Sequence, residues 1–357
     1  MVRPRLDQAF VDGVVPTAVG LVPRVTSLLS SADRWNATKV RWRFGRDDYR
    51  VDPGLYALHH PDADAPVLVT ANYKLSFDAL REPLAELNAW ILVLDTRGIN
   101  VWCAAGKGSF STDEVVRQVE ASRLASLVSH RTLVLPQLGA PGVAAHEVKS
   151  GCGFKVRYGP IRSDDVPAFL AAGSRATAQM RRKSFDLRER VTLIPVELVG
   201  ALPAAAGVLI GAVLLAALVW PGSLATAARD HGLPLALSTL LGLIGGAVLV
   251  PTLLPWLPGR AFAFKGLLAG LPLVLILVAL LRPEHWSLST GLEAMAWVAL
   301  TAAVASYLGM MFTGSSSFTS LSGVRREMRL AVPLQLAGLV VAVATWVGAR
   351  VVAGGGT

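Results

Sequence analysis

Cysteine is scarce in this sequence of 357 residues, which contains only Cys103 and Cys152. Two cysteines exclude a disulfide-stabilised scaffold. Pairs spaced as Cys-x-x-Cys or His-x-x-x-His are also absent from the sequence. A zinc site or an iron–sulfur cluster built from this chain alone would therefore lack ligands.

Complete nucleotide-binding patterns are missing as well. Residues 104–109, Ala-Ala-Gly-Lys-Gly-Ser, echo a phosphate-binding loop, but that pattern needs glycine in place of Val101 and serine or threonine in place of Gly108. No G-x-G-x-x-G sequence follows a predicted strand. The net charge of +9 is modest and unevenly placed. We therefore expect neither a nucleotide cofactor nor a nucleic-acid partner.

Charged residues are rare in the second half of the chain. Residues 192–357 hold eight of the 34 lysines and arginines and five of the 25 aspartates and glutamates. A membrane-spanning helix needs about 20 mostly apolar residues, and five segments there meet this requirement: 194–220, 233–257, 261–281, 292–313 and 330–349. Buried helices of a large soluble protein are a weak alternative for five consecutive segments. The sequence thus predicts a five-helix transmembrane domain over residues 193–350.

Basic residues are unevenly distributed among the joints of these segments. They are frequent before the first segment, after the second and after the fourth, in the set Arg181, Arg182, Lys183, Arg188, Arg190, Arg260, Lys265, Arg325, Arg326 and Arg329. Only Arg229, Arg282 and Arg350 mark the other joints and the tail. Because basic loops stay in the cytoplasm, we expect an inner-membrane protein whose N-terminal half is cytoplasmic and whose C-terminus is outside.

The predicted spans contain few groups that would carry ions or protons. Glu197 and Glu293 lie at span edges, where we expect them to be solvated, and Asp230-His231-Gly232 falls in a joint. Ion pathways usually place charged residues near the midplane. The spans are therefore expected to serve as an anchor or docking platform. A membrane transporter with a regulatory soluble domain remains the alternative from a different class.

The first half of the chain alternates short apolar runs with amphipathic segments. Strands are predicted at 67–71, 90–95, 132–135 and 154–158, and helices at 75–87, 112–128 and 164–172. This alternation predicts an α/β fold with a mostly parallel, Rossmann-like sheet. We expect an N-terminal extension over residues 1–60 and the α/β domain over residues 61–192.

Unusual residues follow the carboxyl ends of these four strands, where ligands bind in parallel sheets. The candidates are Thr70 and Asn72 after the first strand; Asn100, Val101, Trp102, Cys103, Ala104, Ala105, Gly106 and Lys107 after the second; Gln137, Leu138, Gly139 and Gly142 after the third; and Tyr158 and Gly159 at the fourth. Four such loops at one edge favour a binding site over ordinary turns.

Cys103 is the most reactive residue type among these candidates. Asn100 can cap a short helix, and Gly106 or Gly108 can end it. A thiol in the first turn has its thiolate stabilised by the helix N-terminus, and Ala104 and Ala105 are expected to leave open space beside it. The local sequence does not distinguish such a thiolate from a small buried apolar cysteine.

The segment Asn-Val-Trp-Cys-Ala-Ala-Gly-Lys-Gly at 100–108 resembles the signature of the corrinoid protein of microbial mercury methylation. The resemblance continues at 69–78, 135–143 and 158–160, and it covers roughly residues 40–200. The five predicted spans also match the membrane domain of that family in number and place. The α/β domain is also similar to the corrinoid domain of the corrinoid iron–sulfur protein of the reductive acetyl-CoA pathway.

The resemblance implies a cobalamin-type corrinoid with Cys103 as the lower axial ligand of cobalt. Residues 100–107 would form a cap helix below the corrin ring, and the other loop candidates would hold the macrocycle and its tail. The chain has no cysteine cluster for an iron–sulfur centre of its own, and the histidine-ligand signature D-x-H-x-x-G is absent. Cys152 lies outside the motif and receives no role.

The implied activity is that of a corrinoid-dependent methyltransferase, with methyl transfer from methyl-cobalt(III) to inorganic Hg(II) to form methylmercury. A thiolate below cobalt donates more electron density than a neutral imidazole, which suits an electrophilic acceptor. The implied partners are a ferredoxin-like iron–sulfur electron donor and a methyl-donor methyltransferase or methyl-folate, besides the Hg(II) substrate and membrane lipid. A corrinoid methyl carrier with another acceptor stays open, because no part of the sequence indicates a dedicated mercury site.

Overall fold

The computed structural model describes residues 4–220, 223–281, 286–316 and 321–354. These residues divide into two compact units, one formed by the chain up to Val40 together with Phe44–Ser184, and the other by Arg41–Arg43 and the chain from Phe185 onward. The second unit therefore begins a few residues before the expected boundary at residue 193. Arg282, one of the three basic residues at the other joints and the tail, lies outside the described residues.

A seven-stranded sheet organises the first unit, with the order β1-β2-β3-β5-β4-β6-β7. Neighbours β5–β4, β4–β6, β6–β7 and β2–β3 are parallel, whereas β1–β2 and β3–β5 are antiparallel. The strands are β1 (Gly13–Thr17), β2 (Gly20–Val25), β3 (Gly54–Leu58), β4 (Val67–Ala71), β5 (Ala89–Leu94), β6 (Thr132–Leu135) and β7 (Lys155–Tyr158). The predicted α/β fold with a mostly parallel sheet is thus confirmed. Strands β4 and β5 are buried at every position, as their continuous apolar runs require.

The expected division at residue 60 does not separate two parts of the fold. Strands β1, β2 and β3 all come from residues 13–58 and join the same sheet. Every residue of β3, Gly-Leu-Tyr-Ala-Leu, is buried because β2 and β5 pair with it on either side. The segment described as an extension is therefore part of the α/β unit, and its apolar strands were the signal that the expectation missed.

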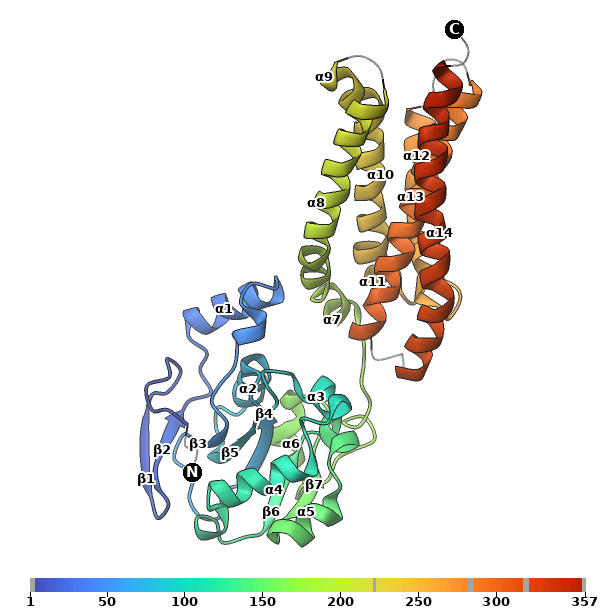
Figure 1. Ribbon diagram of the computed structural model, residues 1–357. Helices are drawn as coiled ribbons and strands as arrows, with labels where there is room; N and C mark the ends of the chain where they lie inside the picture. Colours follow the sequence, from blue (N-terminus) through green and yellow to red (C-terminus); the bar gives the residue numbers. More distant parts are fainter. Residues whose placement is uncertain (1–3, 221–222, 282–285, 317–320, 355–357) are drawn as a thin grey trace. The chain divides into compact units, whose positions relative to one another are not determined.

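Helices cover both faces of the sheet (Figure 1). Residues of α3 (Val101–Lys107), α4 (Thr112–Ala121) and α5 (Ala145–Cys152) share one apolar core with the sheet. Residues of α2 (Lys74–Arg81) and α6 (Val166–Ala171) share a second core on the other face. The remaining helical segments are α1 (Ser31–Arg41), η1 (Arg46–Asp48), η2 (Leu124–Ser126), η3 (Gln137–Gly142) and η4 (Ser163–Asp165). The sheet and its two helical layers place the loops that carry the candidate site residues at one edge of the sheet.

A buried network of four charged side chains joins α1 to α2. Lys74 Nζ donates to Asp33 Oδ1 and Asp78 Oδ2, both at 2.7 Å. Arg81 donates to Asp33 at 3.2 Å and to Asp78 at 2.9 Å, and to the carbonyl oxygen of Thr26 at 2.6 Å. Each charge faces an opposite charge and a hydrogen-bond partner, which is the condition for burying it.

The second unit contains five helices that are long and apolar enough to cross a membrane: Leu187–Val219, Leu224–Leu253, Phe262–Leu280, Leu288–Gly314 and Ser322–Gly354. The first combines α7 (Leu187–Val191) and α8 (Ile194–Val219), and the second combines α9 (Leu224–Ala227), η5 (Ala228–Gly232), α10 (Leu233–Leu243), η6 (Ile244–Leu249) and α11 (Val250–Leu253). The others are α12 (Phe262–Leu280), α13 (Leu288–Met311) with η7 (Phe312–Ser315), and α14 (Leu321–Gly354). Each expected span overlaps one of these helices.

Small residues allow these helices to approach closely. A Cβ built on Gly266 of α12 would lie 2.1 Å from the carbonyl oxygen of Ala305 in α13. A Cβ on Gly245 of η6 would lie 2.8 Å from the Cα of Gly270 in α12. These glycines let the backbones of neighbouring helices in this unit pack closely against one another.

Two expectations about the edges of the spans are wrong. Residues 228–232 are not a joint but a π-helical segment, η5, inside the second helix. Glu293 is only 8% exposed, and its Oε1 and Oε2 lie 3.1 and 3.2 Å from His231 Nδ1. The imidazole of His231 also stacks on Trp220, with ring centroids 3.5 Å apart. The π-helical turn brings His231 toward α13, which removes Glu293 from solvent.

Candidate functional site

The short helix α3 begins just beyond the carboxyl end of β5. Asn100 is its N-cap, and the Asn100 Oδ1 accepts a hydrogen bond from the backbone N–H of Cys103 at 2.9 Å. Gly108 ends the helix with a φ of 79°, a left-handed conformation that glycine adopts without strain. The predicted helix with Asn100 at its start is therefore confirmed, and Gly108 rather than Gly106 ends it.

The faces of α3 differ sharply in exposure. Val101, Ala104 and Ala105 are 9%, 0% and 6% exposed and belong to the core on that face of the sheet. Trp102 is 38% exposed, Cys103 is partly exposed, and Gly106 and Lys107 are exposed. The two alanines therefore anchor the helix and do not leave open space beside the thiol. The side available to a ligand presents Trp102, Cys103 and Gly106.

The loop from β5 to α3 is held by a turn of positive-φ residues. Arg97 and Gly98 have φ angles of 58° and 74°, and the N–H of Ile99 donates to the carbonyl oxygen of Thr96 at 3.2 Å. Positive φ at both central positions is the pattern of a type I′ turn. The turn reverses the chain between β5 and Asn100, which places the start of α3 over the edge of the sheet.

Asn72 organises this loop. Its Oδ1 accepts the N–H groups of Thr96 at 3.1 Å and Gly98 at 2.9 Å, and lies 2.8 Å from Thr96 Oγ1. Its Nδ2 donates to Asp95 Oδ1 at 3.1 Å. Asn72 is only 2% exposed and Thr96 is fully buried. Asn72, expected to contact a cofactor, therefore holds the loop that presents Cys103.

Glu114 is a second support that sequence reasoning missed. It lies in the first turn of α4 and is 9% exposed. Its Oε1 accepts the N–H of Asp95 at 2.7 Å and the Nε2 of Gln118 at 3.0 Å. The contact joins the residue that follows β5 to the neighbouring helix across 19 positions of sequence, which no local pattern could reveal.

The glycines of η3 pack against α3 and its flanking turn. A Cβ on Gly142 would lie 2.1 Å from the carbonyl oxygen of Phe110 and 3.1 Å from the Cα of Ala105. A Cβ on Gly139 would lie 2.5 Å from the ring of Phe110. These two predicted cofactor contacts are therefore close-approach positions, which let the loop after β6 support α3. Gln137 and Leu138 of the same segment stay partly exposed.

Tyr158 at the end of β7, the following Gly159 and Thr70 of β4 complete this edge of the sheet. The Tyr158 hydroxyl donates to the carbonyl oxygen of Val143 at 2.5 Å, and burial raises the pKa of that phenol. The N–H of Gly159 donates to the carbonyl oxygen of Leu135 at 2.8 Å. Thr70 is only 3% exposed within β4. Tyr158 ties β7 to the segment after η3, while Gly159 and Thr70 act within the sheet.

The two cysteines lie at opposite edges of the sheet. Cys103 follows β5, whereas Cys152 ends α5 just before β7 begins. The thiol of Cys152 donates to the carbonyl oxygen of Val148 at 3.2 Å, and burial raises the pKa of that thiol. No group of three or more His, Cys, Asp or Glu side chains suited to a metal occurs among residues 4–220, 223–281, 286–316 and 321–354. Of the two thiols, only Cys103 is positioned at the candidate site.

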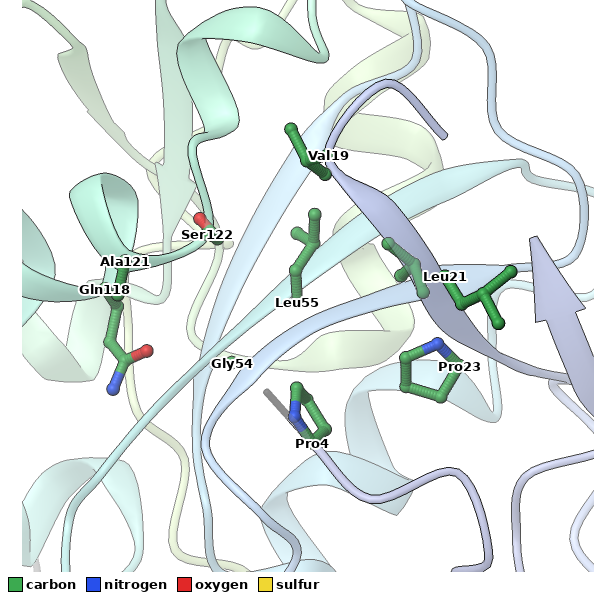
Figure 2. Close-up of a pocket in the computed structure, with 10 residues that line it drawn as sticks. Pro4, Val19, Leu21, Pro23, Gly54, Leu55, Gln118, Ala121 and Ser122 are labelled. Atoms are coloured by element: carbon green, nitrogen blue, oxygen red, sulfur yellow. The ribbon is translucent and has the colours of Figure 1, made fainter. Parts of the chain in front are cut away.

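A small apolar cavity elsewhere in the first unit does not compete with this edge. It is lined by Pro4, Val19, Leu21, Gly54 and Leu55, together with Gln118 and Ala121 of α4 and the following Ser122 (Figure 2). Its volume is about 30 Å³, which is the space of about one water molecule. None of the predicted site residues lines it.

Part of the first unit is similar to a family of known proteins. Residues 30–170 match the family described as CO dehydrogenase/acetyl-CoA synthase delta subunit. The matched segment contains α3 and the four site loops, and it ends before the helical unit begins. The α/β unit is related to this family.

Individual relatives agree with the family match. The chain is 34% identical over 127 residues to the acetyl-CoA decarbonylase/synthase complex subunit gamma of Methanopyrus kandleri, and 33% identical over 127 residues to the same subunit of Archaeoglobus fulgidus. Both matches cover 35% of this chain and 27% of the relative. The match thus spans about a quarter of the length of these curated relatives.

Proposed function

We propose that the α/β unit binds a corrinoid, with the Cys103 thiolate as the lower axial ligand of cobalt. The presentation of Cys103 carries this proposal, because its amide is fixed by Asn100 while its side chain stays partly exposed beyond the carboxyl edge of the sheet. Space beside the helix supports a bulky ligand there, since a Cβ on Gly106 would meet no atom within 4 Å and Trp102 is 38% exposed. The similarity to the acetyl-CoA pathway family supports the same cofactor class.

Each residue around the thiol has a separate task. Cys103 offers a soft sulfur, and Asn100 fixes the helix turn from which that sulfur projects. Ala104 holds α3 against the sheet core, and Asn72 fixes the preceding turn. When bound, the corrinoid supplies a methyl group on its cobalt. The protein orients the ligand and limits the movement of the helix that carries it.

We further propose inorganic Hg(II) as the methyl acceptor. The segment 100–108 supports this assignment, because its resemblance to the mercury-methylation signature is specific. When a corrinoid is bound, the sulfur of Cys103 would donate electron density to its cobalt, which would favour an electrophilic acceptor. The names of the curated relatives favour a second candidate, a corrinoid methyl carrier that serves an acetyl-CoA decarbonylase/synthase complex. The two candidates share the cofactor and differ only in the acceptor.

The two cysteines of this chain also define what its partners must supply. An iron–sulfur cluster is commonly held by four cysteine thiolates, and the chain has two cysteines. We propose that a separate ferredoxin-like protein delivers electrons and that a methyltransferase or methyl-folate delivers the methyl group.

The five apolar helices are proposed to anchor the protein in the cytoplasmic membrane with the α/β unit in the cytoplasm. Their length and composition support spanning, and the basic joints support this orientation. A reporter domain fused after Thr357 should be active only in the periplasm. A reporter that is active only in the cytoplasm would contradict the five-span topology.

An assay of methylmercury formation tests the proposed activity. The purified full-length chain, loaded with methylated corrinoid, is given Hg(II) and a low-potential reductant. Wild type and the Cys152→Ala control should form methylmercury, whereas Cys103→Ala should fall to near the background rate. Activity restricted to a different acceptor, with corrinoid still bound, would favour the acetyl-CoA-type carrier.

A further inference from the structure

An elongated groove runs along the outer surface of the helical unit. It has a volume of about 880 Å³ and is lined by α12, α13 and α14. Helix α13 packs closely against both of the other helices and forms the floor between them. The volume lies within the range of about 300–1,000 Å³ that small-molecule sites occupy. The groove is therefore large enough to hold a ligand.

The floor of the groove is made of small side chains. Ala299, Ala302, Ala303 and Ser306 line it from α13, at the spacing of three and four residues that shares one helix face. The walls are longer apolar residues, with Phe264 on the α12 side and Leu330 and Leu334 on the α14 side. Leu330 and Leu334 are 67% and 73% exposed, so the groove is open along its length. Its shape suits a flexible alkyl chain.

Two arginines stand at one end of the groove without partners. Arg260 and Arg326 both line it, both are exposed, and neither has an ion pair or hydrogen bond among the residues that the structure describes. The neighbouring acid, Glu327, is already engaged, since its Oε1 accepts the N–H of Ala263 at 2.6 Å. The groove thus joins a cationic end to an apolar channel.

The length of the groove matches one leaflet of a bilayer. Arg326 and Gly338 are twelve residues apart along α14 and both line the groove. At about 1.5 Å per residue this separation is roughly 18 Å, and half of a bilayer core is about 15 Å thick. The arginine end belongs to the joints that the charge bias assigns to the cytoplasm. Anionic lipids are enriched in that leaflet and bind basic pockets between helices.

We infer that this groove binds an anionic phospholipid, with its phosphate between Arg260 and Arg326 and an acyl chain along the alanine floor. The inference rests on the proposed membrane location and is independent of the corrinoid and of mercury. Free phosphate shares the headgroup chemistry but has no chain for the floor. A tightly held lipid would fill the space between α12 and α14 and steady the basic end of both helices.

Lipid retention by the detergent-purified full-length protein tests this inference. Native mass spectrometry follows phosphatidylglycerol and phosphatidylcholine of identical chains, added in equal amounts. Wild type should retain one phosphatidylglycerol with at least a tenfold preference, and excess inorganic phosphate should not displace it. The double variant Arg260→Gln/Arg326→Gln should lose that preference, and Ala302→Phe should lose retention by filling the floor.

A matched control separates the groove from general surface charge. Arg325→Gln/Arg329→Gln removes two arginines from the same end of α14 that do not line the groove, and it should retain phosphatidylglycerol like wild type. Equal retention of both lipids by wild type would mean a nonspecific lipid layer and would overturn the inference. An equal loss in the control pair, or displacement by phosphate, would also overturn it. Because no step uses corrinoid or Hg(II), these results are independent of the proposed methyl transfer.

Discussion

The side-chain Oδ1 of Asn100 accepts the backbone N–H of Cys103 at 2.9 Å. This bond makes Cys103 the third residue of α3 and fixes the direction in which its sulfur leaves the helix. The same helix is held from below by Ala104 and from the side by Gly142. The thiol is therefore carried by a short helix that is capped at its start, buried on one face and packed against the loop after β6.

Replacement of Asn72 should loosen the loop between β5 and α3, although Asn72 lies outside that loop in the sequence. Asn72→Ala removes the acceptor of the Thr96 and Gly98 amides and leaves buried donors unpaired. We expect the free energy of unfolding to fall by about 1–3 kcal/mol and corrinoid affinity to fall with it. Hydrogen exchange of the peptide over residues 95–108 measures the loosening directly.

Asn88→Ala is the matched control for that experiment. Within the described part of the chain, Asn88 accepts the N–H of His60, at 3.1 Å and in an exposed position. In the Asn88→Ala variant, hydrogen exchange of the peptide over residues 95–108 should be the same as in wild type. If Asn72→Ala also left this peptide unchanged, the assignment of Asn72 as the organiser of the loop would be wrong.

Two glycines of the site should respond in opposite ways to alanine. Gly142→Ala places a Cβ 2.1 Å from a backbone oxygen, so we expect a loss of several degrees in the melting temperature. Gly106→Ala meets nothing within 4 Å and lies inside a helix, so it should be neutral or stabilising by about 0.5–1 kcal/mol. Thermal unfolding of the two variants without corrinoid compares them. A stable Gly142→Ala would contradict the close approach of η3 to α3.

The buried charge network should give an acid-dependent contribution to stability. Burial alone would raise the pKa of Asp33, but the hydrogen bond and charge of Lys74 and the hydrogen bonds of Ser30 lower that pKa to about 2. Because the folded pKa lies below the unfolded value of about 3.9, the contribution is present above about pH 4 and is lost as the pH falls toward 2.

Asp33→Asn should therefore destabilise the α/β unit near neutral pH, and this destabilisation should be smaller in acid. We expect a difference on the order of 1–2 kcal/mol from wild type near pH 7, which shrinks below about pH 3. The urea midpoint, followed by tryptophan fluorescence at both pH values, measures it. The exposed Asp7→Asn serves as the control for loss of one carboxylate. A difference that stayed constant with pH would refute the ion-pair origin.

The sequence predicted much of the α/β fold because its parallel strands are continuous apolar runs. Val67–Ala71 and Thr132–Leu135 appear in the structure with the expected bounds. The cap helix was also predictable, because Asn100 and Gly108 are local signals of a start and an end. Strands β1, β2 and β3 were missed, because β1 and β2 include prolines and pair across a hairpin at the sheet margin.

The roles of the site residues were less predictable than their location. Asn72, Gly139 and Gly142 lie in the expected loops, yet their partners are other loops and not open space. Glu293 looked solvated, because no local pattern reveals that His231 lies opposite it 62 residues away. Loop positions show where a site can be, whereas long-range contacts decide which residues support it and which remain free for a ligand.

Cobalt K-edge X-ray absorption of the corrinoid-loaded full-length protein tests the central claim most directly. Wild type and Cys152→Ala should show a sulfur scatterer bound to cobalt, and Cys103→Ala should lose that scatterer while it still retains corrinoid. Cys103→His should show nitrogen in place of sulfur. A cobalt–sulfur signal that survives in Cys103→Ala, or its absence from wild type with corrinoid bound, would contradict the thiolate ligand and leave Cys103 as a packing residue of α3.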